Sequence, residues 1–174
     1  MLDLFAKIAS GIAIAANAAG TFVVIGLIAV VNYDIIARGL FNKPFLGAVE
    51  VVQFSMVLIV FLQLPDVIRV GRLTRSDGFL NLMRARKPAL GTNLSRAIDA
   101  ASMFFMILVA VAIWPEFVEM WESNDFFGVP GVFTAPWWPV KLVIFLSACL
   151  CAIHFMLHII TPKIAQAHPE ESGA

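Results

Sequence analysis

Charged residues are scarce in this chain. Only 14% of its 174 residues are Asp, Glu, Lys or Arg, whereas 60% are hydrophobic. Soluble domains carry about 25% charged and about 45–50% apolar residues, so the composition excludes an ordinary soluble domain. Several apolar stretches are long enough for a helix that crosses a bilayer, which takes roughly 20 residues. The sequence therefore predicts an all-α integral membrane protein with one membrane domain over residues 1–174.

The common motifs of catalytic and cofactor sites are also missing. The sequence has no Gly-rich phosphate loop, no nucleophile with a neighbouring base and no zinc-ligand cluster. Its two cysteines, Cys149 and Cys151, lie two residues apart in an apolar run. On a helix they point in different directions and cannot form a disulfide with each other. We therefore expect no enzymatic activity, no bound metal and no cofactor.

Four apolar stretches predict four transmembrane helices. The predicted spans cover about residues 8–33, 45–68, 97–121 and 136–160, and a short polar tail follows at 163–174. No charge lies between Lys7 and Asp34, which corresponds to about 39 Å of helix. A cleaved signal peptide ending near Ala18 is the alternative for the first span. The apolar run continues for a dozen residues past that point, so a transmembrane helix is favoured.

Small residues dominate the first half of the first span. Gly11, Ala15 and Ala19 are four residues apart and share one helical face, and Ala16 and Gly20 form a second row beside it. Small faces allow helix backbones to approach closely in lipid. We expect this half of the helix to pack against another helix, in this chain or in a partner. The alternative is an Ala-rich surface that faces lipid.

The distribution of positive charge predicts the orientation in the membrane. Seven of the twelve positive residues lie between the second and third spans: Arg69, Arg72, Arg75, Arg84, Arg86, Lys87 and Arg96. The connection between the third and fourth spans has none. By the positive-inside rule the basic connection is cytoplasmic, and both termini are then cytoplasmic as well. Within it, residues 79–87 form an amphipathic pattern that predicts a short interfacial helix, with an ordinary basic loop as the alternative.

Tryptophan marks the opposite rim of the membrane. All four tryptophans surround the connection between the third and fourth spans: Trp114, Trp121, Trp137 and Trp138. Since Trp prefers the membrane–water interface, we expect these residues to anchor the protein at the outer surface.

Two sets of polar residues within the spans are candidate sites. Glu50 lies about one turn into the second span, where a carboxylate is costly unless it has a partner. Arg38, across the short first turn, is the predicted partner in a structural ion pair, although Asp34 competes for it; an ion or proton pathway through Glu50 is the alternative. His154 and His158 are four residues apart and share a face. This spacing could hold a haem or a metal ion, but no other span offers a matching His. A role at the interface or in helix packing is therefore favoured for both histidines.

These features together resemble the small membrane subunit of a tripartite ATP-independent periplasmic (TRAP) transporter, the DctQ-like family. The resemblance covers most of the chain and rests on short motifs in a fixed order. The first motif is Arg38, Phe41 and Asn42 after the first span, followed by Glu50 at the start of the second. Arg69, Gly71, Arg72 and Asp77 then match the family's R-x-G-R-H-I-x-V-D run. Pro136 and Trp138 at the start of span four resemble its Pro-x-Trp entry. The chain departs from this pattern at Leu73, where a His is usual, at Thr74 and Ser76, and at 145–147, where a Pro-x-Gly is often seen.

The resemblance implies a non-catalytic subunit of a secondary transporter in the bacterial inner membrane. Its expected partners are a large membrane subunit, which holds the substrate and ion sites, and a periplasmic protein that delivers a small solute, often a carboxylate. The resemblance implies a scaffold role. The position of the basic connection between two membrane spans favours membrane lipids as its partner and gives no reason to expect nucleic acid. Glu116, Glu119 and Glu122 are candidates for a contact with the binding protein, although a solvated face is favoured for them. Three other functions stay open at this point: a haem-binding membrane anchor, a small autonomous channel or carrier, and a general assembly factor.

Overall fold

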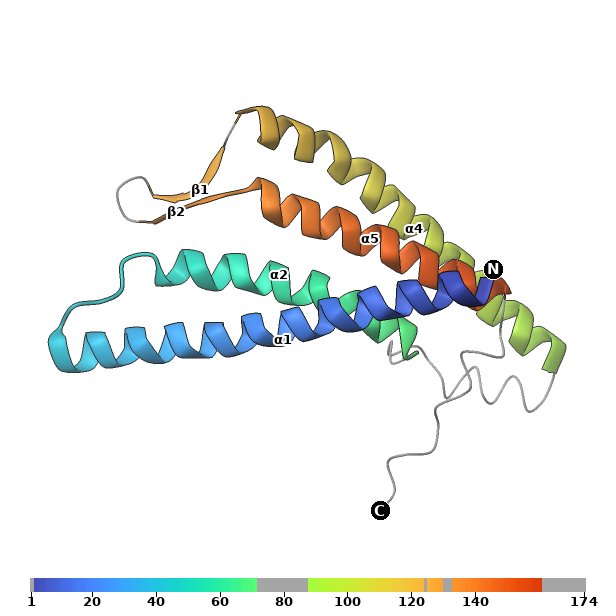
Figure 1. Cartoon of the computed structure of the whole chain (residues 1–174), viewed down its shortest axis with the longest axis horizontal. Helices are drawn as coiled ribbons and strands as arrows, with labels where there is room; N and C mark the ends of the chain where they lie inside the picture. Colours follow the sequence, from blue (N-terminus) through green and yellow to red (C-terminus); the bar gives the residue numbers. More distant parts are fainter. Residues whose placement is uncertain (1, 72–87, 124, 130–132, 161–174) are drawn as a thin grey trace, which may run out of the picture.

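The computed structural model describes residues 2–71, 88–123, 125–129 and 133–160. It contains four long helices, α1 (Leu2–Phe41), α2 (Ala48–Arg69), α4 (Pro88–Ser123) and α5 (Trp138–Ile160), and two short strands, β1 (Phe126–Val129) and β2 (Phe133–Pro136) (Figure 1). All four helices are long and apolar enough to cross a membrane, which confirms the predicted fold class. The predicted interfacial helix at 79–87 and the tail at 163–174 lie outside the described residues.

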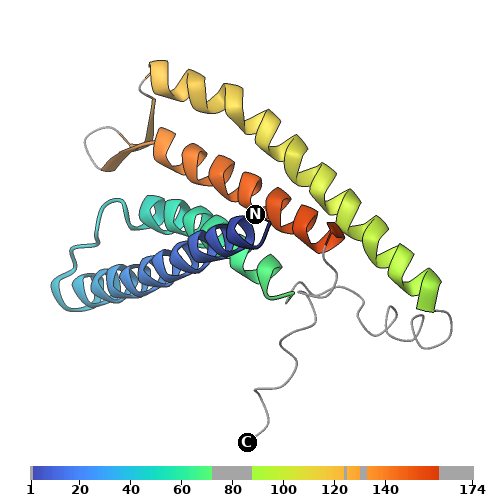
Figure 2. The same ribbon diagram turned by 45° about the vertical axis from the view of Figure 1, so that its right-hand side comes forward.

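The helices are arranged as two antiparallel hairpins. Helix α1 packs along α2, and α4 packs along α5. The two hairpins meet mainly through α2 and α5, which therefore form the middle of the molecule, with α1 and α4 on its flanks (Figures 1 and 2). The buried core lies at this central contact, where Ile68 of α2 packs with Cys151 and Phe155 of α5.

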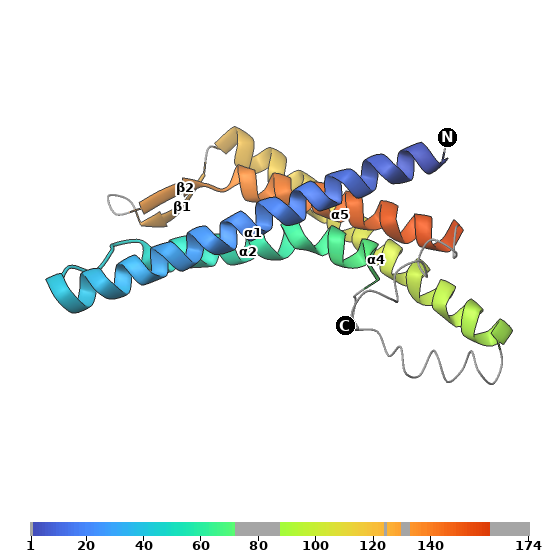
Figure 3. The same cartoon turned by 60° about the horizontal axis from the view of Figure 1, so that its bottom comes forward.

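Helices α1 and α4 are longer than a membrane crossing requires. With 40 and 36 residues they extend for about 60 Å and about 54 Å, compared with a hydrocarbon core of about 30 Å. Figure 3 shows that their first residues diverge from each other. Both helices must therefore tilt in the membrane or continue beyond its hydrocarbon core.

A defined turn joins α1 to α2. Asn42 adopts a left-handed backbone conformation (φ 51°), and the Lys43 amide donates to the Ala37 carbonyl at 3.2 Å. The Phe45 amide donates to the Asp34 carboxylate at 2.8 Å, which ties the turn back to the last turns of α1. These bonds hold the connection against the end of α1.

A small antiparallel hairpin connects α4 to α5. Strands β1 and β2 pair with Phe126 opposite Pro136 and Val129 opposite Phe133. The ring of Phe127 packs edge-on against Trp137, with ring centroids 4.8 Å apart. These two rings line a cavity of about 120 Å³ together with residues from the first turns of α2. The hairpin therefore folds over the start of α2 and adds a second link between the two helical pairs.

Candidate functional site

The crossing of α1 and α2 depends on a glycine. Gly20 is buried, and a Cβ atom at this position would lie 2.9 Å from Cγ of Gln63 and 3.2 Å from Cβ of Leu62. Only a residue without a side chain permits this approach. The intramolecular contact of α1 therefore uses the small residues around Gly20. The row formed by Gly11, Ala15 and Ala19 is exposed instead, and a Cβ added at Gly11 would meet no atom within 4 Å.

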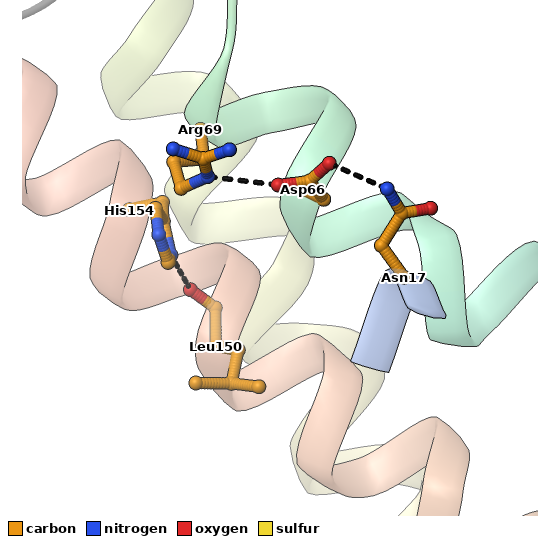
Figure 4. A network of polar contacts seen from close by, with 5 residues as sticks. All are labelled: Asn17, Asp66, Arg69, Leu150 and His154. Carbon is orange, nitrogen blue, oxygen red and sulfur yellow. Dashed lines mark hydrogen bonds and ion pairs between the residues drawn. The ribbon is translucent and has the colours of Figure 1, made fainter. Parts of the chain in front are cut away.

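A polar network links α1 to α2 within the membrane-spanning region (Figure 4). The Asn17 side-chain amide donates to one carboxylate oxygen of Asp66 at 2.8 Å, and Arg69 Nε donates to the other at 2.8 Å. The side chain of Asp66 is 15% exposed and that of Arg69 is 30% exposed. A buried acid that is paired on both oxygens avoids most of the cost of an isolated charge in lipid. Sequence reasoning missed this network, although a lone Asn in an Ala-rich helix was a signal for it.

The structure corrects the predicted pairing of Arg38. Its guanidinium donates to Asp34 at 2.9 Å, and among the described residues Arg38 forms no ion pair with Glu50. The reason is local, because Asp34 lies one helical turn before Arg38 on the same face. Glu50 occupies the first turn of α2, which begins after Gly47. The positive end of the helix dipole stabilises a carboxylate at this position without a cationic partner.

Part of the motif after α2 has a structural explanation. Arg69 belongs to the last turn of α2 and bonds to Asp66 as described above. Gly71 follows with φ +70° and donates its amide to the Ile68 carbonyl at 3.0 Å. A left-handed residue directly after a helix is usually Gly, because other side chains are strained there. The remaining motif residues, Arg72 and Asp77, and the departure at Leu73 lie outside the described residues.

His154 is part of the helix packing of α5. The imidazole is buried, and its Nδ1 lies 2.8 Å from the Leu150 carbonyl (Figure 4). Since a carbonyl only accepts, Nδ1 carries the proton, and the buried Nε2 has no hydrogen-bond partner among the described atoms. His158, one turn later, is half-buried and makes a contact of its own. In the described part of the chain, no group of three or more His, Cys, Asp or Glu side chains is arranged to hold a metal ion.

The tryptophans gather at one end of the helices. Trp114 packs on Phe145 with ring centroids 5.0 Å apart, and Trp121 packs edge-on against Trp138 at 5.1 Å. These contacts join the last turns of α4 to the first turns of α5, and Trp137 joins the same end through the β-hairpin.

The three predicted acidic residues of α4 differ in their surroundings. Glu116 forms an ion pair with Lys141 of α5. Glu119 and Glu122 are exposed, close to the end of α4. Glu116 therefore has a role inside the chain, whereas the carboxylates of Glu119 and Glu122 are available on the surface.

Comparison with known proteins identifies the family. Residues 27–162 match the family model described as "Tripartite ATP-independent periplasmic transporters, DctQ component". A search of curated proteins and a search of solved structures each found no match. The matched region includes α2, α4 and α5 and residues 27–41 of α1, so it covers the central contact and the Trp-rich end. The chain therefore belongs to the DctQ family and is a small membrane subunit of a TRAP transporter in the inner membrane.

Proposed function

We propose that this subunit is a static scaffold that binds the large membrane subunit of its transporter during solute import. The observation that carries the proposal is the continuity of the four spans within the described residues. Secondary transporters usually build substrate and ion sites from discontinuous helices near the middle of the bilayer. Here Asn17, Asp66 and Arg69, which are polar side chains of two spans, bond to each other within the chain.

The exposed small face of α1 supports a helical partner. Gly11, Ala15 and Ala19 are exposed, and Gly26 has open space around it one to two turns further on. On the neighbouring face of the same helix, Gly20 already demonstrates how closely a second helix approaches such a surface. We therefore assign the exposed face to contact with a transmembrane helix of the large subunit. In lipid, close packing rather than hydrophobicity drives the association of helices.

The ends of the molecule support a fixed position in the membrane. On this proposal the Trp-rich end lies at the periplasmic interface, and the opposite ends of α2 and α4, which carry Arg69 and Arg96, lie at the cytoplasmic interface. Two anchored ends hold the depth and tilt of the subunit while its partner moves.

Glu119 and Glu122 are the residues that we propose to contact the periplasmic binding protein. Both are exposed at the Trp-rich end, which is the periplasmic end in this orientation. Replacing both with Lys is expected to slow uptake without loss of the complex. The matched control is Glu116→Gln, because that carboxylate bonds to Lys141 within the chain. Unchanged uptake in the double variant would remove this contact from the proposal.

The solute is expected to be a small carboxylate, because the family resemblance implies this class; on this proposal the residues that select it lie in the other two components. Deletion of this chain tests the scaffold role. Solute uptake is expected to stop and the amount of large subunit in the membrane to fall, and re-expression of the full chain restores both. Uptake that continued at the normal rate after deletion would contradict the scaffold role, and so would solute flux through vesicles that contain this chain alone.

A further inference from the structure

An apolar groove runs along one side of the α4–α5 pair. Its volume is about 420 Å³. Ile107, Val111 and Trp114 line it from α4, and Phe145, Cys149 and Ala152 line it from α5. Val111 is 65% exposed, so the groove is accessible from the side of the helix pair. Since both helices span the membrane, it opens toward lipid and accepts an apolar chain rather than a polar solute.

The groove has a direction relative to the membrane. The Trp114–Phe145 ring pair lies at one end of it, and the Trp121–Trp138 pair lies two turns further along α4. The residues Ile107, Val111 and Trp114 follow the three- and four-residue spacing of one helical face. Because Trp side chains mark the interface, the groove extends from the interface toward the middle of the bilayer. A phospholipid acyl chain has the same direction.

The charge around the Trp-rich end selects the kind of headgroup. Between Pro115 and Trp138 the sequence contains Glu116, Glu119, Glu122 and Asp125 but no Lys or Arg. Lys141, the nearest basic residue of α5, already bonds to Glu116. Glu122 lies eight residues after Trp114 and 15 after Ile107, so helical spacing places it near the face that carries the groove. This end attracts a positive group and repels a lipid with net negative charge.

We propose that this groove binds a phospholipid with an ammonium headgroup, of the phosphatidylethanolamine class. One acyl chain lies between Val111 of α4 and Cys149 of α5. The headgroup lies beside Trp121 and Trp138, where the ammonium group meets the Glu122 carboxylate and the faces of the indole rings. The lipid fills the space between the two helices and so stabilises the Trp-rich end that anchors the subunit. The proposal requires membrane insertion but neither the large subunit nor a transport assay.

The test measures which lipid the full-length chain retains. The purified chain is inserted into nanodiscs with equal amounts of palmitoyl-oleoyl phosphatidylethanolamine and phosphatidylglycerol, and retained lipids are identified by native mass spectrometry. We expect about fivefold preference for phosphatidylethanolamine, the size of one cation–aromatic contact. Cys149→Phe fills the groove and is expected to abolish the preference, and Leu146→Phe, exposed on the same helix, is expected to retain it. If Cys149→Phe does not fold, Val111→Trp closes the groove from its exposed wall.

The headgroup contact is tested separately. Glu122→Gln is expected to reduce the preference for phosphatidylethanolamine, and Glu119→Gln is the matched control because it lies further round α4. Equal retention of the two lipids by the unmodified chain would overturn the proposal. Retention that Cys149→Phe and Val111→Trp leave unchanged would overturn it as well. Loss of the large subunit from these two variants, without any lipid preference in the unmodified chain, would assign the groove to a partner helix instead.

Discussion

The central helices α2 and α5 differ from the flanking helices α1 and α4 in how much of them the chain itself buries. Within an apolar stretch of 18 residues in each helix, 17% of the stretch is buried in α2 and 28% in α5, compared with 6% in α1 and in α4. Hydropathy does not follow this division, because all four stretches are strongly apolar. In water such exposure would be costly, but in a membrane the flanking surfaces contact lipid or another protein. The difference shows that α2 and α5 form the centre of the fold, while α1 and α4 leave most of their surface to lipid or to another protein.

The largest loss of stability is expected from Asp66→Ala, which acts on the contact between the flanking helix α1 and the central helix α2. The change removes both bonds that link Asn17 and Arg69 to one carboxylate and leaves a largely buried guanidinium without its partner. We expect a loss of about 3 kcal/mol in the free energy of unfolding, measured by denaturant titration in detergent micelles. The control is Arg38→Ala, because this side chain is 63% exposed and its pair with Asp34 contributes less than about 1 kcal/mol. Equal losses in the two variants would show that the network does not hold the hairpin together.

Gly20→Leu is expected to have the next largest effect. The new side chain would collide with Gln63 and with Cβ of Leu62, so α1 and α2 must separate. Over-packing of this kind costs about 2 kcal/mol in unfolding free energy, measured in the same titration. Gly26→Leu is the matched control, since a Cβ at Gly26 meets no atom within 4 Å. A stable Gly20→Leu variant would contradict the close approach of the two helices.

Ala15→Trp tests the exposed face of α1 without disturbing the fold. The thermal stability of the isolated chain is expected to stay unchanged, because Ala15 is exposed. Binding of the large subunit is expected to weaken about tenfold, the equivalent of a modest over-packing penalty at a close helix contact. Co-purification with the tagged large subunit measures this change, and Ala112→Trp on the exposed surface of α4 is the control. If only Ala112→Trp weakened the complex, the partner would bind α4.

The smallest effect is expected at the Glu116–Lys141 pair. It joins α4 to α5 near the interface, and the Glu116 side chain is 53% exposed. A double-mutant cycle with Glu116→Gln and Lys141→Gln is expected to give a coupling energy of about 0.5 kcal/mol. A much larger coupling would mean that this end of the α4–α5 hairpin is as tightly held as the central contact.

The sequence predicts the number of helices well, because long uncharged stretches have few alternatives in a membrane protein. It does not show where each helix ends, because a helix can continue past its membrane span. The first span is predicted to end near residue 33, and α1 continues beyond it to Phe41, since the Asp34–Arg38 pair satisfies two charges on a helix that already extends past the apolar stretch. The strands β1 and β2 were not expected, because four-residue strands within a Pro- and Gly-rich connection have no distinct pattern.

The polar contacts were harder to predict than the fold. Arg38 was assigned to Glu50 across the turn, whereas the local competitor Asp34 binds it. The partnership of Asn17 with Asp66 spans 49 residues and depends on the register of α1 against α2. A single sequence shows the small residues that allow α1 and α2 to approach closely. It does not show which residues of α1 lie beside which residues of α2. The same limit applies to the small residues of α1, since their spacing defines two rows without showing which one faces α2.

The central claim is that the helices of this subunit keep their relative positions while the transporter works. Distance measurement between spin labels at Ala29 of α1 and Leu146 of α5 tests it directly, in the complete transporter with Cys149 and Cys151 replaced by Ala. Both labelled positions are exposed and lie on different hairpins. The scaffold account predicts the same distance distribution with and without the solute-loaded binding protein. A second population that appears only during transport would show that the subunit moves with its substrate, and would contradict the account.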